Sequence, residues 1–370
     1  MAKEIKIKLD DPGITRTDLD AAVDAIESSW LVNGPRAREL ESELQKITGR
    51  SHAIATSSGT TALLAAMRAL GVGHGSTVIV PAFTFPAPAA VAAFLGAEVR
   101  VCDVDPATFC VSPATIEPHL DSDVSLVVAI DQFGMPAPVP DLEELLEPRG
   151  VPVLVDAACS IGSTLNNTPC GSLGTVAIFS FHPRKIVTTG EGGAVLTDYD
   201  QIASRARRSV NHGLEGGEFM SMGLNLRMSE IGAAIGKTQL GRLSDIITAR
   251  RALARRYQTL PIQFQKAPTG AETNQQTVAA LLPKPLTSSD RTDLLETLGR
   301  EGIEAGIASY CLGSVPAIAR KLGTDAADTP VARELHERGI ALPLHPKLDE
   351  KEVDEVAAVM FNWLRSRGVE

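Results

Sequence analysis

Short apolar runs rich in β-branched residues alternate with helical patterns between Ile54 and Asp198, and this alternation constrains the fold more than any other feature. The runs are TVIVP, EVRVCDVD, LVVAI, PVLVD, VAIFSF and GAVLTD. Strands separated by helices form a mostly parallel sheet covered by helices on both faces, which is an α/β domain. Ligands of such sheets bind beyond the carboxyl ends of the strands. The residues that follow these runs are therefore the candidates for a functional site.

A different pattern begins after Met228, where one long helical stretch runs to about residue 260. It is followed by a strand candidate TVAALLP, a helix opening at Asp290 and a last amphipathic helix, EKEVDEVAAVMFNWLRSRG. A chain of 370 residues is also longer than one typical domain. We predict a large α/β domain with an N-terminal arm over residues 1–245 and a smaller α+β domain over residues 246–370. The segment QKAPTGAETNQQ is the most linker-like.

The net charge indicates which classes of partner the protein does not bind, and the cysteine content indicates its cellular compartment. The net charge of -10 would repel nucleic acid and anionic lipid, so we predict neither as a partner. Five cysteines without a CxxC pair leave one over in any disulfide scheme, which indicates the reducing cytoplasm. Residues 76–97 are uncharged like a membrane span, but Pro81, Pro86 and Pro88 interrupt them. We expect a strand, a loop and a packed helix there.

The stretch TSSGTTALLAAMRALG predicts a helix whose N-terminus lies at Gly59 and Thr60, because Leu63, Met67 and Leu70 share one helical face. Free backbone N–H groups and the positive end of the helix dipole bind phosphate at such a position. Serine, glycine and threonine are also ordinary capping residues. Phosphate binding and simple capping therefore both fit this stretch.

Two further polar residues follow predicted strands. Asp156 ends the run PVLVD, where a buried carboxylate needs a cationic or donor-rich partner, unless it only caps a following helix. Lys185 follows VAIFSF and precedes the turn TTGEGG. In a dry cleft beside other positive groups, a lysine would lose its proton near neutral pH and become a nucleophile toward an aldehyde. The alternative for a single lysine is a solvated surface charge.

A phosphate cradle, a strand-end carboxylate and an amine are together the three groups that bind pyridoxal phosphate (PLP). The lysine forms a Schiff base with it, and the carboxylate keeps its pyridine nitrogen protonated. We therefore predict pyridoxal 5'-phosphate as the cofactor, with Lys185 and Asp156 as the catalytic residues. No His and Cys spacing indicates a metal site. The absence of GxGxxG argues against a dinucleotide-binding dehydrogenase.

Several segments resemble the DegT/DnrJ/StrS family of fold-type I PLP enzymes, the sugar aminotransferases. They include SSGTTAL, PAFTFPA, VDAACSIG, FSFHPRKIVTTGEGGAVLTD, GLNLRMSEIGAAIGKTQL and LPLHPKLDEKEV. The resemblance implies the fold of a fold-type I PLP-transferase, with a mostly parallel sheet of the seven-stranded type between helices. It also implies a homodimer with two shared active sites.

The resemblance further assigns the cofactor-binding residues, which are Gly59, Thr60, Phe85, Asp156, Cys159, Ser180, Lys185 and Asn225. Backbone groups of Gly59 and Thr60 and the hydroxyl of Ser180 would bind the phosphate. Phe85 would stack on the cofactor ring, unless it is an ordinary core residue. Asn225 would reach the phosphate held by the neighbouring subunit.

Other matching positions carry weaker expectations. The Cys159 position approaches the phenolic oxygen of the cofactor in the family, which usually has Gln or His there, so a weak thiol donor alters the site. We expect Arg227 to be a structural ion-pair partner. His182 and His212 are each either a hydrogen-bonded structural residue or a catalytic one.

The lysine at position 185 favours amine transfer, because the sugar dehydratases of the family carry histidine there. We predict transfer from an amino acid donor, glutamate or glutamine, to a keto sugar. The acceptor is expected to be nucleotide-linked, or else a related cyclitol or natural-product ketone. Cys159 leaves open a PLP-dependent lyase or other carbanion reaction on an amino acid. A non-catalytic PLP-fold sensor is a third alternative.

Overall fold

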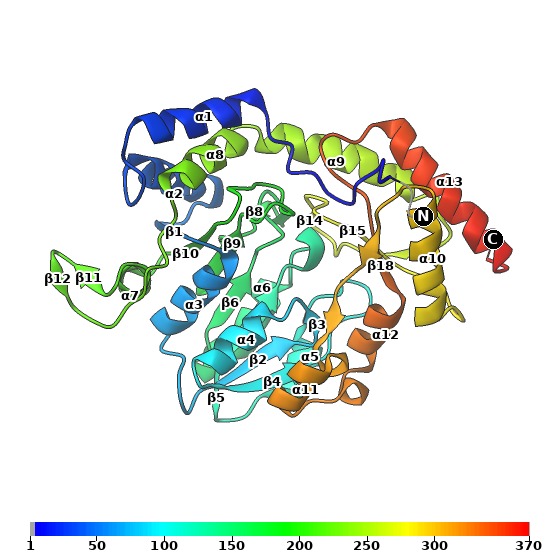
Figure 1. Ribbon diagram of the computed structural model, residues 1–370. Coiled ribbons are helices and arrows are strands. Elements are labelled where there is room, and N and C mark those ends of the chain that lie inside the picture. Colours follow the sequence, from blue (N-terminus) through cyan, green and yellow to red (C-terminus); the bar gives the residue numbers. More distant parts are fainter. Residues whose placement is uncertain (1–3, 370) are drawn as a thin grey trace.

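The computed structural model describes residues 4–369, and its centre is a seven-stranded sheet with the order β1-β10-β9-β6-β5-β2-β4 (Figure 1). Its strands are β1 (His52–Thr56), β2 (Thr77–Pro81), β4 (Glu98–Cys102), β5 (Val124–Ile130), β6 (Val153–Asp156), β9 (Val176–Ser180) and β10 (Gly193–Thr197). β10 is antiparallel to β1 and β9, whereas the other neighbouring pairs are parallel. The mostly parallel sheet predicted from the sequence is confirmed.

Helices cover both faces of this sheet. One face packs against α3 (Gly59–Ala69), α4 (Ala87–Phe94) and α7 (Asp200–Val210), and the other against α2 (Pro35–Thr48), α6 (Val139–Leu146) and α8 (Glu230–Leu240). On β5, Val128 belongs to the core of the first face and Val127 to that of the second. Burial on both faces explains why the strands are continuous apolar runs instead of alternating ones.

The uncharged segment at residues 76–97 folds as predicted, into a strand, a loop and a packed helix. It forms β2, the short strand β3 (Phe83–Thr84) and α4. Among residues 4–369, no helix is both long enough and apolar enough to cross a bilayer.

A second, antiparallel sheet is built from the later part of the chain, in the order β13-β15-β18-β16. Its strands are β13 (Gln263–Phe264), β15 (Val278–Leu281), β16 (Gly306–Ile307) and β18 (Gly339–Leu342). They share a core with α9 (Leu243–Tyr257), α10 (Ser288–Arg300) and α13 (Glu350–Ser366). The predicted final helix and the TVAALLP strand are confirmed.

Two details of the helices differ from the expectation. The single long helix expected after Met228 is two helices, because α8 ends at Leu240 and α9 begins at Leu243. α10 begins at Ser288, two residues before Asp290, whose carboxylate accepts hydrogen bonds from Thr287 in a capping box. An acidic residue at the third helical position closes such a box, so the start lies earlier than the sequence suggested.

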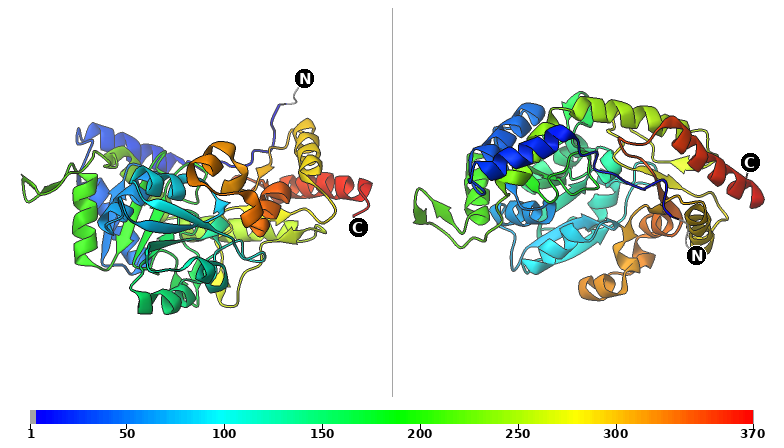
Figure 2. Two further views of the ribbon diagram at one scale, coloured as in Figure 1. Left: turned by 90° about the horizontal axis from the view of Figure 1, so that it is seen from below. Right: turned by 45° about the horizontal axis from the view of Figure 1, so that its top comes forward.

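The two sheets are joined by several crossings of the chain. The N-terminal segment runs from α1 (Arg16–Glu27), which packs on α8, toward the second sheet, and Ile7 forms an isolated bridge with Ile303, just before β16 (Figure 2). Two further strand pairs join the later part of the chain to the part that forms the large sheet. β17 (Tyr310–Cys311) pairs with β3, and β14 (Ala271–Glu272) pairs with β7 (Thr164–Leu165). β7 also pairs with β8 (Thr168–Pro169), and α11 (Pro316–Leu322) and α12 (Pro330–Arg338) complete this part. The division into domains at residues 245 and 246 stays a prediction.

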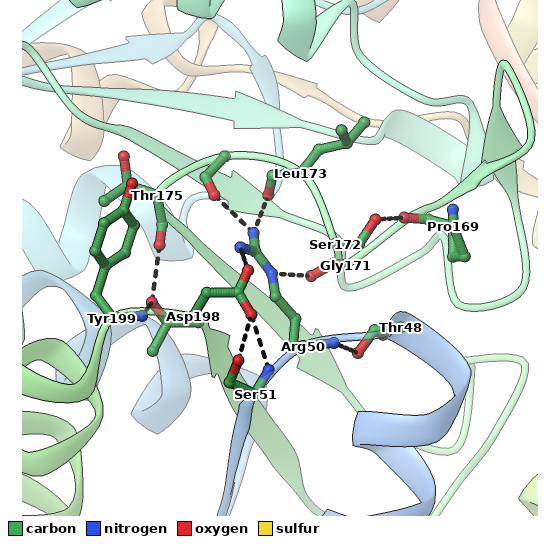
Figure 3. A network of polar contacts seen from close by, with 12 residues as sticks. Thr48, Arg50, Ser51, Pro169, Gly171, Ser172, Leu173, Thr175, Asp198 and Tyr199 are labelled. Carbon is green, nitrogen blue, oxygen red and sulfur yellow. Dashed lines mark hydrogen bonds and ion pairs between the residues drawn. The ribbon is translucent and has the colours of Figure 1, made fainter.

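Arg50 joins the loop that precedes β9 to Asp198, the residue after β10, at the edge of the sheet opposite the carboxyl end of β9 (Figure 3). Its guanidinium donates to the carbonyl oxygens of Gly171, Leu173 and Gly174 at 3.1, 2.7 and 2.6 Å, and to Asp198 at 2.7 Å. Arg50 is 6% exposed. The planar guanidinium satisfies carbonyl groups that would otherwise lie buried without donors, so we assign Arg50 a structural role.

Candidate active site

Lys185 lies five residues beyond the end of β9, in the loop that leads to β10. Its side chain is partly buried, and its Nζ donates a hydrogen bond of 3.0 Å to the Sγ of Cys159. Cys159 comes from the turn after β6. The structure therefore brings together two residues that are 26 positions apart in the chain. The alternative that Lys185 is a solvated surface charge is wrong.

The protonation of Lys185 differs from the expectation. Burial by itself lowers the pKa of Lys185, but Cys159, followed by Asp156 and Asp10, outweighs burial and raises it above its ordinary value. The sequence analysis placed positive groups beside the amine, whereas the carboxylates Asp156 and Asp10 supply negative charge. In the chain without cofactor, Lys185 is therefore an ammonium at neutral pH, and its amine must lose a proton before it can attack an aldehyde.

Asp156 is the last residue of β6 and is buried. Its Oδ1 accepts a hydrogen bond of 3.1 Å from the Ala158 amide, and its Oδ2 has no hydrogen-bond partner within residues 4–369. Burial raises the pKa of Asp156, against the lowering effects of the Ala158 amide and Lys185. A turn follows β6, so the alternative that Asp156 caps a helix is wrong. An oxygen without a partner is available to a protonated ring nitrogen.

Gly59 and Thr60 are the first two residues of α3, as predicted. The cap is provided by Ser58, whose hydroxyl accepts a hydrogen bond of 3.1 Å from the Thr61 amide. The amides of Gly59 and Thr60 donate to no other residue in the described part of the chain. These two N–H groups remain free at the positive end of the helix dipole, which is an arrangement that binds anions.

Ser180 completes this cradle from the last position of β9. A Cβ added to Gly59 would lie 2.7 Å from the Cβ of Ser180 and 2.9 Å from its Oγ. Only glycine therefore allows α3 to approach the strand so closely. The Ser180 hydroxyl, like the two free amides, makes no hydrogen bond to another residue between 4 and 369.

Asn274 supports the Cys159 turn and was not predicted as a site residue. Its side chain is fully buried, and its Nδ2 donates to the carbonyl oxygens of Cys159 at 2.8 Å and Ile161 at 2.9 Å. Gly134, with φ +91°, leaves room for its amide group, since a Cβ there would collide with Asn274 Oδ1. The linker-like character predicted for residues 265–276 is wrong, because Asn274 within them is buried. An isolated asparagine in a polar stretch gives no sequence signal of this role.

Two acidic residues near the site were also missed. Asp131 is buried and accepts a hydrogen bond of 2.6 Å from Ser160, and burial raises its pKa to about 6. Asp10, in the N-terminal segment, lies near Lys185 and two arginines. Burial raises the pKa of Asp10 to about 6, although Arg250 and Arg184 oppose this change. Neither residue belongs to a run that indicates a function.

Phe85 lies just beyond β3 and is 66% exposed. Its ring meets that of Tyr310 edge to face, with centroids 6.5 Å apart. The alternative that Phe85 is a core residue is wrong for this chain. Stacking of its exposed ring on a cofactor stays a prediction.

Asn225 is exposed and its side chain makes no hydrogen bond with any other described residue. Its neighbour Leu226 accepts a hydrogen bond of 2.7 Å from the amide of Ser57, close to the start of α3. Arg227 donates to Asn211 Oδ1 at 2.6 Å, so its partner is an amide and the expected ion pair is wrong. The structure does not join Asn225 to the cradle of its own chain.

His182 and His212 lie in different local environments. His182 lies 4.0 Å from Glu191, and burial lowers its pKa more than that carboxylate raises it. His212 has a left-handed backbone with φ +56°, and its amide donates to the Leu224 carbonyl at 2.9 Å. Catalytic and structural roles for both remain open.

The residues at this site fit pyridoxal phosphate. Two free amides and one free hydroxyl converge where a side chain on Gly59 would clash, which suits a phosphate group. One buried carboxylate and one amine lie at the same edge of the sheet, because Asp156 on β6 pairs with Ile178 on β9, the strand before Lys185. Within residues 4–369, no group of acidic, histidine or cysteine residues is arranged to hold a metal ion.

A mostly parallel sheet with these groups at its carboxyl edge defines a fold-type I PLP-dependent transferase. The chain belongs to the DegT/DnrJ/EryC1/StrS aminotransferase family, whose profile matches residues 12–361. The PLP-dependent aminotransferase predicted from the sequence is thereby confirmed at the level of the family.

Solved structures agree with this assignment. TlmJ, an aminotransferase from Streptoalloteichus hindustanus, is 28% identical, with a TM-score of 0.91 over 98% of this chain and 100% of its own. A DegT/DnrJ/EryC1/StrS aminotransferase from Brucella abortus is also 28% identical, with a TM-score of 0.84 over 94% and 95% of the two chains. Spr1654 from Streptococcus pneumoniae, solved in a PLP form, is 24% identical with a TM-score of 0.92 over 99% of both chains. At 24% identity, the similarity to Spr1654 supports the shared fold alone.

Proposed function

We propose that this chain transfers an amino group from an amino acid donor, glutamate or glutamine, to a keto sugar. The acceptor is nucleotide-linked, or is a related cyclitol or natural-product ketone. The observation that carries the proposal is Lys185 at the same sheet edge as Asp156 and the free amides of α3. When bound, pyridoxal phosphate supplies an aldehyde that carries the amino group and a ring that accepts electrons.

The proposal gives each residue one task. Lys185 Nζ binds the aldehyde carbon as a Schiff base and, once released, moves the α proton of the donor as acid and base. Asp156 holds the proton on the ring nitrogen. The amides of Gly59 and Thr60 and the Ser180 hydroxyl donate to the phosphate. Chemistry in two halves, with donor and acceptor bound in turn, predicts ping-pong kinetics.

We also propose a homodimer whose sites are shared through Asn225. The hairpin of β11 (Leu214–Glu215) and β12 (Glu218–Phe219) projects from the body of the chain, on the same side as α7 (Figure 1). Exposed apolar side chains lie in the hairpin and just after it, with Phe219 76% and Met222 85% exposed. A second subunit that covered them would gain free energy from their burial. Five free cysteines support the proposed cytoplasmic location.

The amine-transfer proposal is tested by spectroscopy on the purified chain. PLP should produce an imine absorption band, and glutamate or glutamine should convert it to the pyridoxamine form with one equivalent of 2-oxo acid. Lys185→Ala should abolish the band, whereas Lys321→Ala, at an exposed lysine of α11, should keep it. A band without any 2-oxo acid would favour the lyase alternative that Cys159 suggests. A band that survives Lys185→Ala would refute the proposal.

A further inference from the structure

The connection between β14 and β15 reaches both turns of the candidate active site. The buried Asn274 holds the Cys159 turn through its Nδ2. Two residues further on, Gln276 is 8% exposed, and its Nε2 donates a hydrogen bond of 2.8 Å to the carbonyl oxygen of Arg184. Arg184 directly precedes Lys185 in the loop between β9 and β10, the lysine loop. One short segment from the later part of the chain therefore contacts the two turns whose side chains meet at 3.0 Å.

The side-chain amide of Gln276 has a defined orientation. Its Oε1 accepts a hydrogen bond of 2.9 Å from the Thr277 hydroxyl. The carbonyl oxygen of Arg184 can only accept, so Nε2 is the atom that must face it. The backbone amide of Gln276 donates to Asn274 Oδ1 at 2.9 Å, and its carbonyl oxygen accepts from Arg250 Nη2 at 2.5 Å. These contacts engage its backbone and both ends of its amide group, and they hold the side chain against the lysine loop.

A second buried glutamine holds the lysine loop on the other side of Lys185. Gln239 of α8 is 1% exposed, and its Oε1 accepts a hydrogen bond of 2.9 Å from the Thr188 amide. Within the loop, the Lys185 amide donates to the His182 carbonyl at 2.8 Å, which closes a turn. The loop is therefore held one residue before the lysine by the later part of the chain, and three residues after it by a helix of the large sheet.

We propose that Gln276 is a positioning residue, whose hydrogen bond to the Arg184 carbonyl sets the backbone from which Lys185 reaches into the site. The Arg184 carbonyl would lose this donor without Gln276. A displacement of a reacting group by about 1 Å lowers a rate about 100-fold, so a contact one residue away from Lys185 affects its chemistry. The inference rests on the proposed function, because the placement of Lys185 matters for amine transfer only if this lysine carries the cofactor.

Hydrogen–deuterium exchange of the full-length chain without cofactor tests the contact itself. Gln276→Met removes the donor at similar length, so the amides of residues 181–190 should exchange about tenfold faster. Gln265→Met is the matched control, because Gln265 Nε2 donates to the carbonyls of Thr108 at 2.6 Å and Gln132 at 3.0 Å. That variant also loses bonds between the later part of the chain and the large sheet, but these bonds lie outside the lysine loop. Residues 181–190 should then exchange at the unaltered rate.

Three exchange results would overturn the inference. The first is equal exchange of residues 181–190 in Gln276→Met and the unaltered chain. The second is equal acceleration in the two methionine variants, because general loosening of the chain would explain it. The third applies if Gln276→Met does not fold. Thr277→Val removes only the hydroxyl that orients the amide and should speed the same exchange about threefold, so an unchanged rate in that variant would contradict the proposal.

The donor half-reaction tests the effect on the chemistry. With PLP bound and glutamate or glutamine saturating, Gln276→Met should convert to the pyridoxamine form about 10–100-fold more slowly. The half-saturating donor concentration should stay within about twofold, because Gln276 bonds to the loop backbone instead of the donor. Gln265→Met should keep the unaltered rate. A raised half-saturating concentration with an unchanged maximum rate would assign Gln276 to donor binding and overturn the positioning role. If the unaltered chain does not convert, the proposed function fails, whereas the exchange result still decides whether Gln276 holds the loop.

Discussion

Replacing Gly59 with alanine should widen the candidate phosphate cradle. The new Cβ would lie 2.7 Å from Ser180 Cβ, about 0.8 Å closer than the roughly 3.5 Å at which two carbon atoms attract best. Both atoms sit on short side chains that cannot swing away, so α3 or β9 must shift. Overpacking of this kind costs about 1–3 kcal/mol of the free energy of unfolding.

The same shift should weaken cofactor binding. A hydrogen bond to a charged group is worth about 1.5–3 kcal/mol, and each 1.4 kcal/mol is about a factor of ten in affinity. Loss of one amide contact to the phosphate therefore predicts a dissociation constant for PLP raised about 10–100-fold. Urea unfolding of the cofactor-free chain measures the first effect, and a fluorescence titration with PLP measures the second.

Two matched variants make this prediction decisive. Gly299→Ala adds the same methyl group to helix α10 where nothing lies within 4 Å, so it should be neutral or stabilising by up to about 1 kcal/mol. Ser180→Gly removes the obstructing Cβ, so in the double variant Gly59→Ala should recover much of its lost stability, which a double-mutant cycle detects. If Gly59→Ala behaved like Gly299→Ala in both assays, the close approach of α3 and β9 would not be what requires glycine.

Three further predictions concern buried charges. Asp156→Asn should lower amine transfer at least about 100-fold in a coupled assay, yet leave the cofactor-free chain as stable or more so, because the buried carboxylate is disfavoured by burial. Arg50→Met should lower the free energy of unfolding by about 2–4 kcal/mol, with unchanged PLP affinity because it lies at the far end of the sheet; weakened PLP binding would contradict this. Burial raises the pKa of Asp131 to about 6 in the folded chain, so between pH 4 and pH 6 that chain keeps a proton which the unfolded chain has lost. The free energy of unfolding therefore falls as pH rises from 4 to 6. In urea unfolding, Asp131→Asn should lose about 2–3 kcal/mol less of this free energy across that window than the unaltered chain does. An equal pH dependence in the two chains would refute this.

The sequence predicted the sheet and the order of its polar residues because both depend on local patterns. Buried parallel strands must be apolar runs, and Asp156 ends one of them while Lys185 lies five residues beyond another. Such patterns do not reveal contacts between distant residues. The Asn274 side chain meets the Cys159 carbonyl across 115 positions of the chain, and nothing near residue 274 marks it.

Errors in the prediction have the same origin. The prediction for the protonation of Lys185 was wrong because its neighbours come from other elements, and Asp156 and Asp10 among them carry negative charge. The long helix after Met228 is interrupted at Gly241 and Arg242, where the chain leaves the large sheet. Helical periodicity continues across such a break, so it gives no sign of it.

The hydrogen bond from Asn274 to the Cys159 turn also imposes an order on biosynthesis. The seven strands of the large sheet are complete by residue 197, well before residue 274 leaves the ribosome. A nascent chain can thus acquire its scaffold early, but the loop bearing the thiol is secured only when the later segment arrives. Only a chain synthesised beyond residue 274 would then bind pyridoxal phosphate. Chains truncated before residue 274 should fail to bind it.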